Sequence, residues 1–94
     1  MKIAEIIWLE NIVEKLERRH AVRREEVKEA LANSKRFRFV EKGHRRGENV
    51  YSALAQTEAG RYLTIFFIYK IDKQALILSA RDMTSRERRR YEKK

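Results

Sequence analysis

The spacing of apolar residues changes from a helical to an alternating pattern near residue 34, and this change constrains the fold most. Before it, Ile12, Val13 and Leu16 recur at the i, i+1 and i+4 spacing of one helix face. After it, apolar and charged residues alternate from Arg36 to Val40, which is typical of a strand. The pattern therefore predicts helices first and a sheet second.

Two N-terminal helices are predicted, over residues 10–19 and 24–33. In the second, Val27 and Leu31 fall on one face, and acidic residues occupy the first turn, where the helix dipole favours them. The apolar residues 6–8 form either a short strand or an apolar lead-in to the first helix.

Strands are predicted over residues 36–41, 50–57, 61–70 and 75–81. Their links are short, which favours an antiparallel meander. Thr84-x-x-Glu87 is a capping box, so a last helix is expected over 84–93. The expected fold class is α+β, in one domain over 1–94: a small antiparallel sheet of three to four strands packed with two N-terminal helices and a C-terminal helix.

One face of this sheet has to be covered by the helices, because its strands carry Leu63, Ile65, Phe67, Tyr69, Leu76, Leu78 and Ala80. Successive side chains of a strand point to opposite faces. If Leu78 and Ala80 face the helices, Arg81 emerges on the open face of the sheet.

The composition points to an anionic partner. The chain has 23 Lys and Arg against 14 Asp and Glu, a net charge of +9, and a pI near 10.2. Such a field attracts nucleic acid, although a membrane surface or an acidic protein would also fit. There is no cysteine, and His20 and His44 lie far apart, so no metal site or other cofactor is expected. No signal peptide or membrane-spanning segment is expected either, and a cytoplasmic location is the default.

The C-terminal residues resemble a known family. Ser79-Ala80-Arg81, followed by Thr84, Glu87, Arg88 and Tyr91, is similar to the end of the BrnT toxins, in which a strand closing in Ser-Ala-Arg leads into a T-x-x-E-R-x-x-Y helix. The resemblance extends over residues 6–92, through Ile7-Trp8, Asn11, His20, Val22, the run 25–27 and Gly47-Glu48.

This resemblance implies a RelE-like fold and the toxin half of a type II toxin–antitoxin pair. Such toxins cleave RNA without a metal, and a cognate antitoxin with a ribbon-helix-helix part neutralises them. Operator DNA is contacted only through that complex. The chain departs from the family pattern at Leu9, at Ala21 where glycine is usual, and at Arg23 where a small hydroxyl residue usually caps the second helix, a change that weakens the cap by about 1 kcal/mol.

Arg81 is the first candidate catalytic residue, because a planar guanidinium can bind two phosphate oxygens at once and the family motif falls on it. The alternative is a structural arginine paired with Asp72 or Glu87. His20 is a candidate base or acid, since histidine titrates near neutral pH, or else simply complements the end of its helix.

Tyr51 and Lys70 are further catalytic candidates: a tyrosine can stack on a base or donate a proton, and a lysine can stabilise developing negative charge. Tyr51 could equally be a core residue, and Lys70 could simply end its strand in solvent. Glu48 is a candidate general base, although a carboxylate in such a loop is more often solvated.

Two basic segments are candidates for binding RNA. Arg45 and Arg46 lie in the loop after the first strand, and Arg86 and Arg89 share a face of the last helix. The leading hypothesis is an RNA endonuclease toxin. The alternatives are a non-catalytic nucleic-acid-binding or regulatory protein on the same fold, and an interaction module whose basic face receives an acidic antitoxin.

Overall fold

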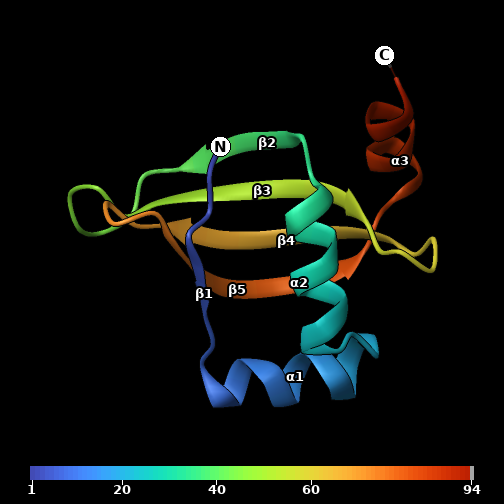
Figure 1. Ribbon diagram of the computed structural model, residues 1–94, viewed down its shortest axis with the longest axis horizontal. Coiled ribbons are helices and arrows are strands. Elements are labelled where there is room, and N and C mark those ends of the chain that lie inside the picture. The colour runs from blue at the N-terminus through green and yellow to red at the C-terminus, as the bar shows by residue number, and fades with distance from the viewer. Residues whose placement is uncertain (94) are drawn as a thin grey trace.

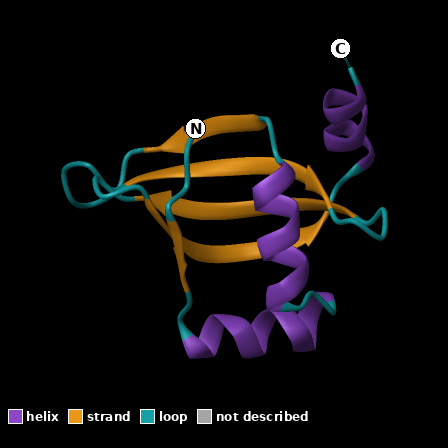
Figure 2. Cartoon of the chain, viewed as in Figure 1, coloured by secondary structure: helices purple, strands orange, loops and turns teal. Residues whose placement is uncertain are grey.

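The computed structural model describes residues 1–93 and shows an α+β chain (Figure 1). The elements follow in the order β1 (Glu5–Ile7), α1 (Glu10–His20), α2 (Arg24–Asn33), β2 (Arg36–Glu41), β3 (Asn49–Gln56), β4 (Tyr62–Tyr69), β5 (Gln74–Asp82) and α3 (Ser85–Glu92). Figure 2 shows α2 lying across one face of a single sheet, with α1 at the β5 side of the sheet and α3 at one end. Each helix and strand predicted from the sequence is present, with its ends within one residue of the prediction.

The sheet has five strands in the order β1-β5-β4-β3-β2, so the prediction of three to four strands was wrong. The additional strand is β1, which pairs parallel with β5 through contacts such as Ile6 with Ala75, and this makes the sheet mixed. Only Glu5–Ile7 form β1, which is too short for a recognisable alternation, and its partner lies about 70 residues away. The other neighbouring strands are antiparallel, as expected.

The core lies between the sheet and the first two helices. Its fully or nearly fully buried residues are Leu16, Val22, Val27, Ala30, Leu31, Ala53, Ala55, Leu63, Ile65, Phe67, Ala75, Ile77 and Ala80. We call the sheet surface that carries these residues the helix face, and the opposite surface the open face. Leu63, Ile65 and Phe67 face the core, as the alternation predicted.

The prediction that Leu76 and Leu78 are buried was wrong, because β5 contains a β-bulge. Phe66 pairs with Ser79 and Phe67 with Ile77, so Leu78 is one extra residue in β5. The extra residue shifts the alternation, and Ala75 and Ile77 fill the core in place of Leu76 and Leu78. Ala80 lies beyond the bulge and keeps its predicted place in the core.

The turn between α1 and α2 occupies the left-handed backbone region. Ala21 has φ 51° and caps the C-terminal end of α1. Its N–H donates to the carbonyl of Leu16. Glycine adopts this conformation without strain, whereas a residue with a Cβ does so at a cost of roughly 1 kcal/mol. The position where the resembled family usually has glycine is therefore a left-handed one. At the start of α2, the side chain of Glu26 accepts from the backbone N–H of Arg23 at 3.0 Å.

The last helix begins with the predicted capping box. Thr84 accepts from the N–H of Glu87 at 3.1 Å, and Glu87 accepts from the N–H of Thr84 at 2.9 Å. None of the described residues of α3 is buried, so polar and aromatic contacts hold it at the end of the sheet. No helix within residues 1–93 is long and apolar enough to cross a membrane.

Candidate nucleic-acid interface

Two rows of side chains cross the open face near α3. Strand register places Arg36, Leu54, Thr64 and Arg81 side by side across β2, β3, β4 and β5. Neighbouring strands lie about 4.8 Å apart, so the backbones of Arg36 and Arg81 are separated by roughly 14 Å. The next row, toward the middle of the sheet, consists of Arg38, Ser52, Phe66 and Ser79. Arginines therefore border the open face at both sides.

Arg81 is fixed by a bidentate ion pair with Glu87. Its two terminal nitrogens donate to the Glu87 carboxylate at 2.7 and 3.0 Å, and one of them also donates to the Asp82 carbonyl at 3.2 Å. The guanidinium lies 5.4 Å from the ring centre of Phe66. Of the two structural alternatives for Arg81, a pair with Asp72 or with Glu87, the second is present.

The ion pair changes the titration of both groups. Arg81 is the main cause that lowers the pKa of Glu87 to about 2, and hydrogen bonds from the Thr84 backbone and the Thr64 hydroxyl act in the same direction against the effect of burial. The pKa of Arg81 is raised in turn by the hydrogen bonds to Glu87. At neutral pH Glu87 is therefore a firmly ionised carboxylate that orients Arg81, and a weak proton acceptor.

The last helix covers one end of the open face. Arg88 lies 4.0 Å from the ring centre of Tyr62, and Tyr91 packs edge-on against the same ring. The guanidinium of Arg36 donates to the carbonyl of Lys93 and connects the end of α3 to β2. Side chains of the sheet beneath this end, such as Thr64 and Leu54, are consequently buried although no other helix of residues 1–93 covers this face.

A cationic hollow of about 480 Å³ lies between α3 and β2. Its lining includes Lys35, Arg36, Arg38 and Arg90, over Ser52 and Leu54. Within residues 1–93, no carboxylate lines it. Such a concentration of uncompensated cations in a concave surface favours a bound phosphate chain or another polyanion. The part played by β2 was not predicted from the sequence, because only the fold brings Arg36 and Arg38 next to Arg90.

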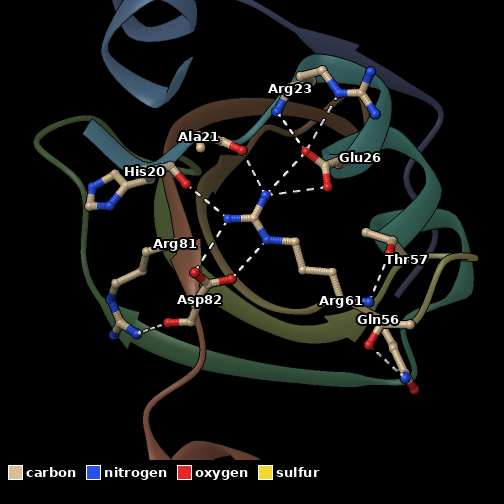
Figure 3. Close-up of polar contacts among 10 residues, drawn as sticks. His20, Ala21, Arg23, Glu26, Gln56, Thr57, Arg61, Arg81 and Asp82 are labelled. Carbon is tan, nitrogen blue, oxygen red and sulfur yellow. Dashed lines mark hydrogen bonds and ion pairs between the residues drawn. The ribbon is translucent and has the colours of Figure 1, made fainter. Parts of the chain in front are cut away.

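A second arginine at this end of the sheet, Arg61, lies on the helix face (Figure 3). It donates to the carbonyls of His20 and Ala21 at 2.8 and 2.7 Å, to Glu26 at 3.2 Å and to Asp82 at 2.8 Å. The pKa of Asp82 is lowered mainly by Arg61 and also by the nearby His20. Arg61 thus joins the α1–α2 turn, the start of α2 and the end of β5. No sequence motif predicts this role of Arg61.

The predicted catalytic residues do not form one cluster. His20 lies at the same end of the molecule as Arg81; its side chain is exposed, and its carbonyl is the group that Arg61 binds. Tyr51 lies on the helix face, where its ring stacks on that of Phe67 with the ring centres 6.2 Å apart. Lys70 lies at the other end of β4, roughly 20 Å along the strand from Thr64, and pairs with Glu48 at 3.1 Å.

The predicted RNA-binding residues also fall into two groups. Arg86 and Arg89 are exposed on α3, near Arg81. Arg45 and Arg46 are exposed in the loop between β2 and β3, at the opposite end of the sheet beside the β4–β5 turn (Figure 1). The structure therefore presents two separate basic ends, and only the end with α3 contains Arg81 and the cationic hollow.

No protein-family model matches this chain, and no curated protein matches it in sequence. The resemblance to the BrnT toxins accordingly stands on the residues quoted above.

Proposed function

We propose that the chain is a toxin of the type II toxin–antitoxin class that binds RNA on the open face and cleaves it without a metal. The supporting observation is the cationic hollow, with Arg81 on the same face and at the same end of the sheet. Lys35, Arg36, Arg38 and Arg90 are suited to hold the phosphate chain beside it. As with the resembled family, a ribbon-helix-helix antitoxin is the expected neutralising partner.

In this proposal Arg81 binds the scissile phosphate. A guanidinium has five N–H groups. Within residues 1–93, Arg81 uses three of them, two on Glu87 and one on the Asp82 carbonyl, so two remain for a ligand. Because Glu87 fixes its orientation, Arg81 can stabilise the charge that develops on the phosphate without first having to reorganise.

His20 is the proposed proton-transfer group at this end, since its side chain is exposed and lies at the same end of the molecule as Arg81 (Figure 3). Tyr51 and Lys70 have no part in the proposed cleavage, because one lies on the helix face and the other at the far end of β4.

One observation favours a second candidate, an RNA-binding protein that does not cleave. The Glu87 carboxylate already neutralises Arg81, and both oxygens of that carboxylate lie within hydrogen-bond distance of the guanidinium. A phosphate that approaches Arg81 therefore meets a fixed negative charge beside it.

The test is cleavage of a labelled single-stranded RNA in EDTA by the purified chain and by Arg81→Ala, with Lys70→Ala as the matched control. Lys70 is a strand-end cation paired with a glutamate, and its side chain is 31% exposed, against 32% for Arg81. We expect Arg81→Ala to reduce cleavage by about 100-fold to 1000-fold, and Lys70→Ala to leave it unchanged.

A folded Arg81→Ala variant that cleaves as fast as the wild type would remove Arg81 from the mechanism. Binding of RNA by the wild type without cleavage, in this assay and in a translation extract, would support the second candidate. Absence of both binding and cleavage would contradict both.

A further inference from the structure

β2 forms the border of the sheet opposite β1 (Figure 1). It pairs with β3 on one side only, and no other segment of residues 1–93 pairs with its outer side. Alternate N–H and C=O groups of an edge strand point away from the sheet, where they can pair with another extended chain. The outer edge of β2 is therefore available for an additional strand.

The two faces of β2 differ sharply in chemistry. Arg36 and Arg38 stand on the open face, beside the cationic hollow. Phe37 and Phe39 stand on the helix face, where Phe39 packs edge-on against the Tyr51 ring and remains 51% exposed. A strand placed beside β2 would thus meet positive charge on one face and apolar surface on the other.

A second copy of the chain does not suit this edge. Pairing of β2 with β2 would bring Arg36 and Arg38 of one copy next to the same residues of the other, and like charges directly opposite each other destabilise a sheet. The bulge between Phe39 and Glu41 interrupts the regular edge further. Charged residues and bulges of this kind protect edge strands from self-association.

We propose that the outer edge of β2 receives an extended segment of a partner protein in which acidic and apolar residues alternate. Its carboxylates would lie on the open face, against Arg36, Arg38 and the cationic hollow, and its apolar side chains would cover Phe39. This proposal stands on the free edge and its charges, and it does not require that the chain cleave RNA. Because the carboxylates and an RNA would share the hollow, the two ligands would compete.

The test uses a synthetic peptide of about seven residues in which valine and glutamate alternate. Its binding to the full chain is measured by fluorescence anisotropy, and the amide protection of β2 by hydrogen exchange. Two further peptides carry N-methyl groups on every second amide, one in each frame. In a paired strand only alternate N–H groups face the neighbour. We therefore expect one methylated frame to lose at least 10-fold in affinity and the other to bind nearly as well as the parent.

Arg36→Glu with Arg38→Glu should weaken the parent peptide at least 10-fold. The matched control, Arg45→Glu with Arg46→Glu, makes the same change of charge at the other end of the sheet and should leave peptide affinity within about 2-fold. Equal binding of both methylated frames would show charge attraction alone and overturn the proposal. Failure of the parent peptide to bind at low salt, or a wild-type dimer that the peptide does not dissociate, would also overturn it. RNA binding is measured in the same buffer. If RNA binds and the peptide does not, the proposal for β2 fails while the proposed function stands.

Discussion

Arg61 and Arg81 lie at the same end of the sheet, on opposite faces, and both form ion pairs with carboxylates. The contacts of Arg61 use all five of its N–H groups: two carbonyls, Glu26, and two bonds to Asp82. Arg81 uses three, and its only carboxylate partner within residues 1–93 is Glu87. The side chains are similarly exposed, at 25% and 32%, so exposure does not separate them.

The difference lies in what each arginine can still bind. Arg61 is saturated by acceptors from three parts of the chain, which makes it a residue that holds the fold together. Arg81 keeps donors free on a face where the neighbouring cations have no carboxylate among them. An ion pair in a structure therefore does not settle whether an arginine is structural; the count of its remaining donors is more informative.

The largest effect on stability is expected for Arg61→Ala. The change removes the cation that pairs with Glu26, whose side chain is only 17% exposed and, within residues 1–93, keeps only the bond from the Arg23 N–H among its close donors. It also leaves the carbonyls of His20 and Ala21 without the Arg61 donor. We expect a loss of roughly 2–3 kcal/mol in the free energy of unfolding, measured with urea. Arg81→Ala, which removes one ion pair, should cost about 1 kcal/mol.

A suitable control is Arg23→Ala. Arg23 also approaches Glu26, at 3.8 Å, but its side chain is 71% exposed, so less than about 0.5 kcal/mol is expected. If Arg61→Ala costs no more than Arg23→Ala, the contrast between a saturated and an available arginine loses its basis.

The second largest effect is expected on the pH dependence of stability, through the ion pair between Glu87 and Arg81. The pKa of Glu87 is lowered from 4.5 to about 2, chiefly by Arg81. A lowered pKa in the folded state means that the stabilisation is complete above about 4.5 and disappears as the pH falls toward 2. Glu87→Gln removes this contribution, so the wild type should be more stable than the variant at pH 7, by on the order of 2 kcal/mol, and this advantage should shrink in acid.

Urea unfolding of both proteins at several pH values between 7 and 3 measures this advantage. Because the comparison is a difference between two proteins, the other carboxylates, including the Asp82 that Arg61 binds, largely cancel. An advantage that stays constant over the whole range would mean that Glu87 does not hold Arg81 through its charge.

Most of the elements were predictable, because they depend on local patterns. The period of apolar residues located α2 and β2, and the Thr84-x-x-Glu87 box located α3. A strand near residues 6–8 was one of two alternatives left open by the sequence, but its parallel pairing with β5 and the bulge at Leu78 were not predictable, since each is defined by a partner elsewhere in the sheet. A single extra residue moved Leu76 out of the core and Ile77 into it.

The candidate site was predictable in part for the same reason. Arg81 stood in a recognisable motif, and its place next to Ala80 put it on the open face. The contributions of Arg36 and Arg38 depend on strand register, and that of Arg61 depends on a turn 40 residues earlier in the chain. Neither dependence leaves a pattern in the sequence.

The smallest effect expected is on the salt dependence of RNA binding, and it distinguishes the two basic ends of the sheet. Arg86→Glu with Arg89→Glu changes the end that carries Arg81, and Arg45→Glu with Arg46→Glu applies the same change of charge to the far end. Removing one cation that neutralises a phosphate of single-stranded RNA lowers the slope of log affinity against log salt by about 0.7. We expect the first pair to lower the slope by about 1 and to weaken all RNA sequences alike, and the second pair to change it less. Equal slopes for the two variants would mean that RNA responds to the overall charge of +9, and that the open face holds no defined phosphate path.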